Sequence, residues 1–205
     1  MSRSETTKKV TRIQRKKTTE VLDAALDVFS INGFRGSTID MIAKRAGLSK
    51  ANIFYYFNSK EEIHSQLISQ LLEKWLEPLK KLSATGDPTE EICDYVSRKL
   101  QMSKIYPRES RLFANEILQG APRIHKALKS DLKDLVDEKI LIIQKWSDDG
   151  LIAEVHPYHL IFSIWSLTQH YSDFDVQVRA VLTHEEPYEN AELYLHDLFT
   201  KLLKP

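Results

Sequence analysis

Residues 49–56 place polar and aromatic side chains at a spacing that suits contact with nucleic-acid bases. In a DNA major groove, Asn can make two hydrogen bonds with adenine, and Lys can donate to O6 and N7 of guanine. Ala or an aromatic ring can contact the thymine methyl group. The side chains on the outer face of a helix over this stretch are therefore candidate base contacts: Ser49, Lys50, Ala51, Asn52 and Phe54.

Four aromatic residues follow one another from Phe54 to Phe57. Successive residues of a helix point in different directions, so one buried face cannot cover all four rings. We expect at least two of the rings, among the DNA-binding candidates Phe54, Tyr55 and Tyr56, to lie against sugar and phosphate, and Phe57 to pack inward. The alternative is an ordinary aromatic cluster inside a hydrophobic core.

A second set of side chains could hold a small planar ligand. Trp165 and Gln169 are one helical turn apart, which pairs a flat ring with an amide that both donates and accepts hydrogen bonds. Three further helices supply the other candidates for this pocket: Trp75, Lys99, Ser103, Phe113 and Glu116. The alternative is that the tryptophan belongs to the core and that Gln169 bonds a neighbouring backbone carbonyl.

Short helices must position the candidate base contacts of residues 49–56. Ser37 with Asp40 predicts a helix start, Ala46 and Gly47 predict its end, and Ser49 caps the next helix. Two short helices joined by the sequence AGLS are typical of a helix-turn-helix, whose second helix enters the major groove. A small core fixes the two helices: Ile42, Ala43, Leu48 and Ile53. Ser59 with Glu62 then opens a longer helix.

The whole chain of 205 residues reads as all-α, with about nine helices. We expect a basic N-terminal arm over 1–17, a helix-turn-helix domain over 18–62, and an effector-binding and dimerisation domain over 63–205. One long helix is expected from Ile124 to Trp146. The last two helices, over 158–181 and 188–203, should form the interface of a homodimer through Leu160, Ile164, Leu195, Leu198 and Leu202.

Charge is distributed unevenly although the net charge is zero. Residues 1–60 contain 12 Lys/Arg and 5 Asp/Glu, whereas the rest contains 17 and 24. The first third therefore favours a polyanion. Six of its basic residues lie between Lys8 and Lys17, in an arm or in the first turn of a helix. Lys60, at a helix N-terminus, is a candidate phosphate contact, or else a surface lysine without a role.

Other classes of protein find little support. The single Cys93 excludes a disulfide framework and a cysteine-based zinc site. The seven histidines form neither H-x-x-x-H nor H-E-x-x-H, and no nucleophile elbow or phosphate loop is present. We expect no enzyme activity, no metal and no cofactor. The absence of a signal peptide and of a long apolar stretch predicts a soluble, cytoplasmic protein without a membrane partner.

The sequence TIDMIAKRAGLSKANIFYYFNSKEEI, preceded by ALDVFSINGFRGST, resembles the DNA-binding domain of TetR-type bacterial repressors. The resemblance implies an all-helical homodimer that binds a palindromic double-stranded operator and is released by a small effector. It also implies DNA contacts at a set of positions: Thr38, Lys44, Ser49, Lys50, Asn52, Phe54, Tyr56 and Lys60. Phe54 stands where that family usually has Tyr, so one phosphate contact of the family is in doubt here.

Three further segments resemble the C-terminal domain of the repressors of pyrimidine utilisation. They are SRLFANEILQGAP (110–122), DLKDLVDEK (131–139) and HLIFSIWSLTQHYSDF (159–174). This resemblance implies a pyrimidine base such as uracil or thymine as the effector. An alternative function keeps the DNA binding but has no small-molecule effector, as in an architectural protein or one controlled by a protein partner.

Overall fold

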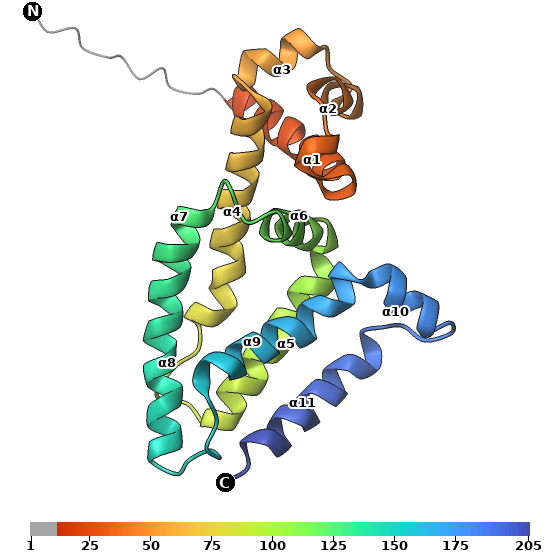
Figure 1. Ribbon diagram of the computed structural model, residues 1–205. Helices are drawn as coiled ribbons and strands as arrows, with labels where there is room; N and C mark the ends of the chain where they lie inside the picture. Colours follow the sequence, from red (N-terminus) through yellow and green to blue (C-terminus); the bar gives the residue numbers. More distant parts are fainter. Residues whose placement is uncertain (1–11) are drawn as a thin grey trace, which may run out of the picture. The chain divides into compact units, whose positions relative to one another are not determined.

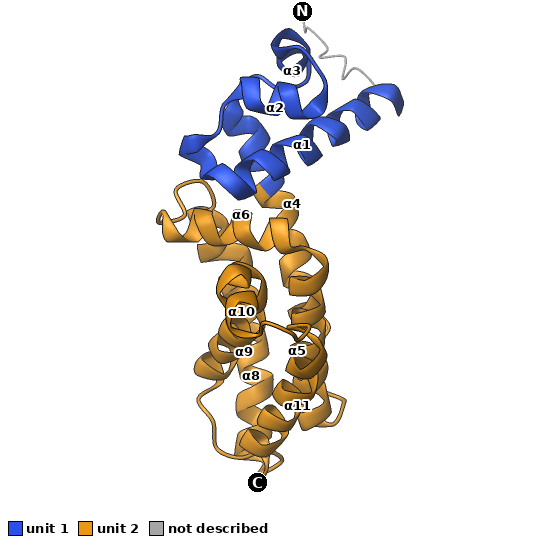
Figure 2. Cartoon of the chain, turned by 90° about the vertical axis from the view of Figure 1, so that its right-hand side faces the viewer, with its two compact units in different colours: residues 1–67 blue, residues 68–205 orange. Residues whose placement is uncertain are grey.

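The computed structural model describes residues 12–205, which are helical and contain no strand (Figure 1). This confirms the predicted all-α class. The chain divides between Leu67 and Ile68 into two compact units (Figure 2). Each unit has its own hydrophobic core and is described separately.

The first unit contains α1 (Arg12–Gly36), α2 (Ile39–Ala46), α3 (Lys50–Tyr56) and the beginning of α4 (Lys60–Lys80). Because α1 begins at Arg12, residues 12–17 of the predicted arm are helical, while the rest of that arm lies outside the described residues. Gly33 interrupts α1 with a φ of 64°, which glycine adopts without steric cost. The helix is therefore kinked at this glycine and continues to Gly36.

Local rules explain the ends of the short helices. Gly47 adopts a left-handed conformation with φ 65°, and the N–H of Leu48 reaches back to the carbonyl of Ala43 at 3.0 Å. Ser49 caps α3 by accepting a hydrogen bond from the N–H of Asn52 at 3.2 Å. The predicted cap of α2 was wrong by one residue. Thr38 takes that role, because the Ser37 hydroxyl is buried and donates to the carbonyl of Gly33 at 2.6 Å.

The core of the first unit fixes α3 against α1 and α2. Ile42 and Ile53 are fully buried, as is Phe29 of α1. Phe57, directly after α3, is buried as well, which confirms that this ring packs inward. A short helix of this kind depends on such packing, because isolated helices of two turns are unstable in water.

The second unit begins within α4 and continues through α5 (Pro88–Ile105) and α6 (Pro107–Leu118). The helix predicted from Ile124 to Trp146 is a continuous run made of α7 (His125–Ala127), a π-helical turn η1 (Leu128–Leu132) and α8 (Lys133–Asp148). The chain ends with α9 (Pro157–Asp173), α10 (Asp175–Val181) and α11 (Glu189–Leu203). With α7, η1 and α8 counted as one run, residues 12–205 form 10 helices, in agreement with the prediction of about nine. The single helix predicted over 158–181 is divided at Phe174 into α9 and α10.

The core of the second unit corrects the predicted dimer interface. Leu160, Ile164 and Leu195 are at most 4% exposed and pack with α5 and α8 in the core of a single chain. Leu198 is half-buried against the same core, and only Leu202 is exposed. The prediction that these leucines and this isoleucine face a partner is therefore wrong for the three buried residues. Helix periodicity identified an apolar face correctly but assigned it to the wrong neighbour.

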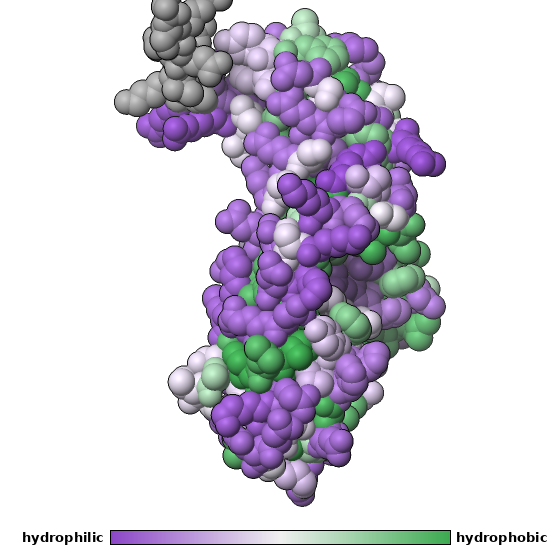
Figure 3. All heavy atoms as spheres, turned by 60° about the vertical axis from the view of Figure 1, so that its left-hand side comes forward, coloured by the Kyte–Doolittle hydropathy of each residue, from purple (hydrophilic) through white to green (hydrophobic). Residues whose placement is uncertain are grey.

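The surface is mostly hydrophilic on the side toward which α8 lies, and its hydrophobic residues gather in patches (Figure 3). Large apolar side chains are also exposed on other helices of the second unit, including Phe162 on α9 and Leu193 on α11. None of the helices within residues 12–205 is both long and apolar enough to span a bilayer.

Candidate nucleic-acid interface and ligand cavity

Helix α3 turns one buried residue inward and leaves the predicted base contacts outside. Ile53 is the buried residue of the helix. The candidate contacts on the helix and its cap are exposed to solvent: Ser49, Lys50, Ala51, Asn52, Phe54 and Tyr55. Tyr56 is half-buried and packs edge-on against Tyr55, with 5.0 Å between the ring centroids. The exposed face thus combines hydrogen-bonding groups with two accessible rings.

Some of the predicted DNA contacts already have partners within the chain. The ammonium of Lys50 pairs with Asp40 at 2.8 Å, and both side chains are exposed. The ammonium of Lys60 donates to the carbonyls of Phe34 and Ser37, at 2.9 Å and 2.8 Å. A phosphate contact by Lys60 would therefore use its third N–H group. Thr38 and Lys44 are exposed and lie on α2 or at its cap.

The second unit encloses a cavity of about 660 Å³ that is lined mainly by apolar side chains. Helices α4, α5, α6 and α9 form its walls, together with η1. Five of the predicted effector residues line it: Trp75, Lys99, Phe113, Trp165 and Gln169. A volume of this size lies within the range of about 300–1,000 Å³ that is usual for small-ligand sites.

Two predicted residues do not line the cavity, which corrects the sequence prediction. The hydroxyl of Ser103 is buried and donates to the carbonyl of Lys99 at 3.3 Å. The carboxylate of Glu116 is buried and accepts from the N–H and the guanidinium of Arg123, at 2.8 Å and 2.9 Å. Ser103 therefore bonds the backbone of its own helix, and Glu116 binds Arg123 in the loop after α6.

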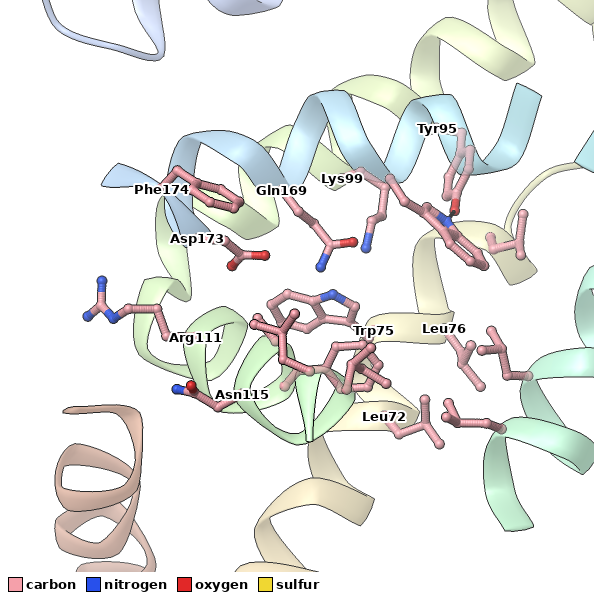
Figure 4. Close-up of a pocket in the computed structure, with 18 residues that line it drawn as sticks. Leu72, Trp75, Leu76, Tyr95, Lys99, Arg111, Asn115, Gln169, Asp173 and Phe174 are labelled. Atoms are coloured by element: carbon pink, nitrogen blue, oxygen red, sulfur yellow. Dashed lines mark hydrogen bonds between the residues drawn. The ribbon is translucent and has the colours of Figure 1, made fainter. Parts of the chain in front are cut away.

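The two tryptophans of the cavity differ in the state of their N–H groups. The indole N–H of Trp165 donates to the hydroxyl of Tyr95 at 2.6 Å. The indole N–H of Trp75 is buried and has no hydrogen-bond partner among the described residues. Figure 4 shows this N–H edge turned toward the amide of Gln169, whose side chain forms no hydrogen bond in the described part of the chain. An unsatisfied buried donor is costly, and a ligand acceptor would relieve that cost.

A lysine and an aspartate, Lys99 and Asp173, lie on the same side of the cavity, with Gln169 between them (Figure 4). Lys99 is only 2% exposed, and this burial lowers its pKa to about 7, although the charge of Asp173 acts in the opposite direction. Burial also raises the pKa of Asp173, against hydrogen bonds from Ser110 and Ser172 and the charge of Lys99. Both shifts follow from the cost of keeping a charge in apolar surroundings.

Sequence reasoning missed Asp173 and Tyr95 as cavity residues. Asp173 follows Gln169 by four positions, as Gln169 follows Trp165, so the three share one face of α9. Tyr95 precedes Lys99 by the same spacing on α5. Extending the pair Trp165 and Gln169 forward by one helical turn, and the candidates Lys99 and Ser103 of α5 backward by one turn, would have found both residues. Within residues 12–205, no three His, Cys, Asp or Glu side chains gather as a metal site would require.

Comparison with known proteins matches both units to described families. Residues 21–67 match "Bacterial regulatory proteins, tetR family", and residues 68–205 match "YcdC-like protein, C-terminal region". The HTH-type transcriptional regulator RutR of Escherichia coli (strain K12) is 46% identical over 176 residues. That alignment covers 86% of this chain and 83% of the relative.

Two solved structures share the fold at low sequence identity. A TetR-like transcriptional regulator from Rhodococcus sp. RHA1 superposes with a TM-score of 0.66 at 20% identity, covering 90% of this chain and 94% of that one. The regulator AibR, solved in complex with isovaleryl coenzyme A and operator DNA, gives a TM-score of 0.69 at 16% identity. The coverage is 92% of this chain and 99% of AibR.

Proposed function

Because this chain belongs to the TetR family of bacterial regulatory proteins and is a transcriptional regulator rather than an enzyme, we propose that it is a ligand-controlled repressor. Two copies would bind a palindromic operator through their α3 helices. A small effector in the cavity of the second unit would weaken that binding. Uracil and thymine are the proposed effectors, because three segments of the second unit resemble the repressors of pyrimidine utilisation.

The observation that carries the effector proposal is the cavity with its aromatic walls and free polar groups. The rings of Trp75 and Trp165 offer flat apolar surfaces, and Gln169 offers an amide with an uncommitted donor and acceptor. A pyrimidine base has a π-face and an edge with N–H and C=O groups, which matches this combination. The open space beside Trp165 does not favour the alternative without an effector, which would fit a filled core there.

DNA binding would use the exposed face of α3. Asn52 and Lys50 are proposed to contact bases, and Phe54 and Tyr55 to contact the sugar–phosphate backbone. Thr38, Lys44, Tyr56 and Lys60 are proposed as further contacts. In a two-fold dimer the recognition helices must reach major grooves that lie about 34–36 Å apart, or a multiple of that distance.

The homodimer is proposed to form through exposed apolar residues of the last helices. The set consists of Phe162, Val181, Leu193, Tyr194 and Leu202, which are all at least 46% exposed. Large apolar side chains that gather on a surface are typical of protein interfaces, so we propose that these residues meet a second copy of the chain. The residues replace the buried positions predicted from the sequence.

Helix α4 offers a route for coupling, because it carries Ile63 in the core of the first unit and Trp75 in the cavity of the second. The effector can weaken DNA binding only if it binds more tightly to the arrangement that fits the operator less well. The operator affinity then changes by the same factor as the ratio of the effector's affinities for the two arrangements of the protein.

The proposal is tested by selecting bound fragments from a random DNA pool and then titrating uracil and thymine into the complex at fixed salt. We expect a palindrome to be selected and either base to release it. Gln169→Ala should abolish the release but preserve operator binding. Gln144→Ala, at an exposed glutamine of α8 that bonds Asp148, is the matched control and should respond like the unaltered protein. A palindrome that ignores both bases would refute the effector assignment.

A further inference from the structure

Lys99 and Asp173 line the same cavity but do not form an ion pair with each other. No oxygen of Asp173 lies within 4.0 Å of the Lys99 ammonium, although each group interacts electrostatically with the other. Opposite charges buried in apolar surroundings usually pair, because an isolated buried charge is costly. The gap between these two groups is therefore suited to a molecule that bonds to both.

Each of the two groups has hydrogen-bonding capacity left. The hydroxyl of Ser110 donates to Oδ1 of Asp173, and the hydroxyl of Ser172 lies 3.4 Å from the same oxygen. Oδ2 is left without a hydrogen bond among the described residues. The Lys99 ammonium lies 5.0 Å from the centre of the Trp75 ring and makes no hydrogen bond in the same part of the chain. The Trp75 N–H is also unpartnered. The side of the cavity around Gln169 thus presents two donor groups, the Lys99 ammonium and the Trp75 N–H, and one acceptor, Oδ2 of Asp173.

We propose that the cavity selects ligands containing a ring amide, in which a C=O and an N–H are neighbours. The N–H donates to Oδ2 of Asp173, and the C=O accepts from Lys99 or from the indole of Trp75. The amide of Gln169, which lies between them in Figure 4, completes the contact with the ligand edge. Asp173 is accordingly the residue that distinguishes a ring N–H from a ring nitrogen without hydrogen. This inference rests on the proposed effector function and adds to it the residue that recognises the ring N–H of the ligand.

Burial shifts the pKa of each group toward its neutral form, upward for Asp173 and downward for Lys99. Such shifts are typical of charged groups that lack a close partner and are common at binding sites. Arg111 and Asn115 also line the cavity, but Figure 4 shows their polar ends turned away from Gln169 and Lys99. The donors and the acceptor without partners are therefore concentrated around Gln169, and the other residues that line the cavity are mainly apolar.

The test measures binding by isothermal titration calorimetry with the full-length protein. Uracil is compared with 1,3-dimethyluracil, which keeps both C=O groups but has no N–H. We expect the unaltered protein to bind uracil at least about tenfold more tightly, because the dimethyl compound leaves the carboxylate of Asp173 without a donor.

Asp173→Asn is the decisive variant. It keeps the Oδ1 acceptor for Ser110 and Ser172 but replaces the free oxygen by a donor N–H₂ group. We expect uracil affinity to fall roughly tenfold to a hundredfold and the preference over 1,3-dimethyluracil to be lost. Asp175→Asn is the matched control, because it alters a neighbouring aspartate that pairs with Arg179 outside the cavity. This variant should keep the uracil affinity and the preference over 1,3-dimethyluracil. A purely structural role of Asp173 would weaken both compounds alike and leave their ratio unchanged.

The outcomes separate this inference from the proposed pyrimidine effector. Equal binding of the two compounds, or a ratio unchanged in Asp173→Asn, would refute the ring-amide inference and leave the effector proposal standing. Binding of hydantoin, a ring amide that is not a pyrimidine, without binding of uracil or thymine would refute the pyrimidine assignment. If Asp173→Asn loses the binding of hydantoin, the ring-amide inference holds. If Asp173→Asn still binds hydantoin, the ring-amide inference fails. Failure of all three compounds to bind would overturn both.

Discussion

Lys99→Met is expected to stabilise the unliganded protein near neutral pH and to lose this effect as the pH rises. The unfolded chain holds the Lys99 proton up to its ordinary pKa of 10.5, whereas the folded chain holds it only below about 7. Between these values the unfolded state binds more protons, so the free energy of unfolding of the unaltered protein rises with pH. Below pH 7 the full cost of burying the charge is present.

The size of the effect follows from the pKa shift. Each pKa unit corresponds to about 1.4 kcal/mol, so lowering the pKa from 10.5 to about 7 corresponds to at most about 5 kcal/mol. Methionine has a similar length and no charge, so it removes this cost while filling the same space. We expect a gain of a few kcal/mol at pH 6–7, falling toward zero near pH 10.5.

Urea unfolding followed by tryptophan fluorescence measures this gain at a series of pH values. Trp75, Trp146 and Trp165 all lie in the second unit, as Lys99 does, so the signal reports on the relevant unit. Protein concentration is kept fixed, because the proposed dimerisation would shift apparent stability. Lys139→Met is the control: this buried lysine pairs with Glu138 at 2.8 Å, and its replacement should bring no gain at pH 7. A gain for Lys99→Met that is absent, or constant from pH 6 to 10, would refute the reasoning.

Three further changes test other parts of the molecule. Gly47→Ala should lower the free energy of unfolding by about 1–2 kcal/mol through backbone strain alone, since φ is +65° and an added Cβ meets nothing within 4 Å; a much larger loss in thermal unfolding would indicate a clash instead. Asn52→Ala should weaken binding to the selected operator by about 1–3 kcal/mol, with no comparable loss on unrelated DNA; equal losses in a fluorescence anisotropy assay would remove its role in base recognition. Phe162→Arg should shift the protein toward monomer in sedimentation experiments without unfolding it, because Phe162 is exposed; a fully dimeric variant would exclude Phe162 from the interface.

The helix-turn-helix could be predicted from the sequence because short-range rules determine it. Gly47 and Ser49 act through their own backbone conformation and their nearest neighbours, and both behave as expected. The cap of α2 shows where such rules end. Ser37 and Thr38 both carry hydroxyls that could cap, and only the position of the Gly33 carbonyl, set by the kink in α1, assigns Ser37 to another bond.

The errors in the second unit share one physical cause. Periodicity shows which residues lie on one face of a helix, but it does not show what that face meets. Leu160 and Ile164 are apolar residues of α9, as predicted, yet they face helices of their own chain. Ser103 and Glu116 sit at the expected turns of α5 and α6 and point away from the cavity. Which face meets a cavity depends on the packing of several helices, which is not encoded in any one of them.

The π-helical turn Leu128–Leu132 gives the wall of the cavity a place where chain length can change locally. Leu128 and Leu132 both line the cavity at this turn. A π-turn takes up one extra residue within a helix, so the helices before and after it keep nearly the same relative rotation. Removing one residue here would restore α-helical geometry and would change mainly the directions of the side chains within the turn. A change in chain length at this turn would therefore reshape one part of the cavity wall while the other helices that line it stay as they are.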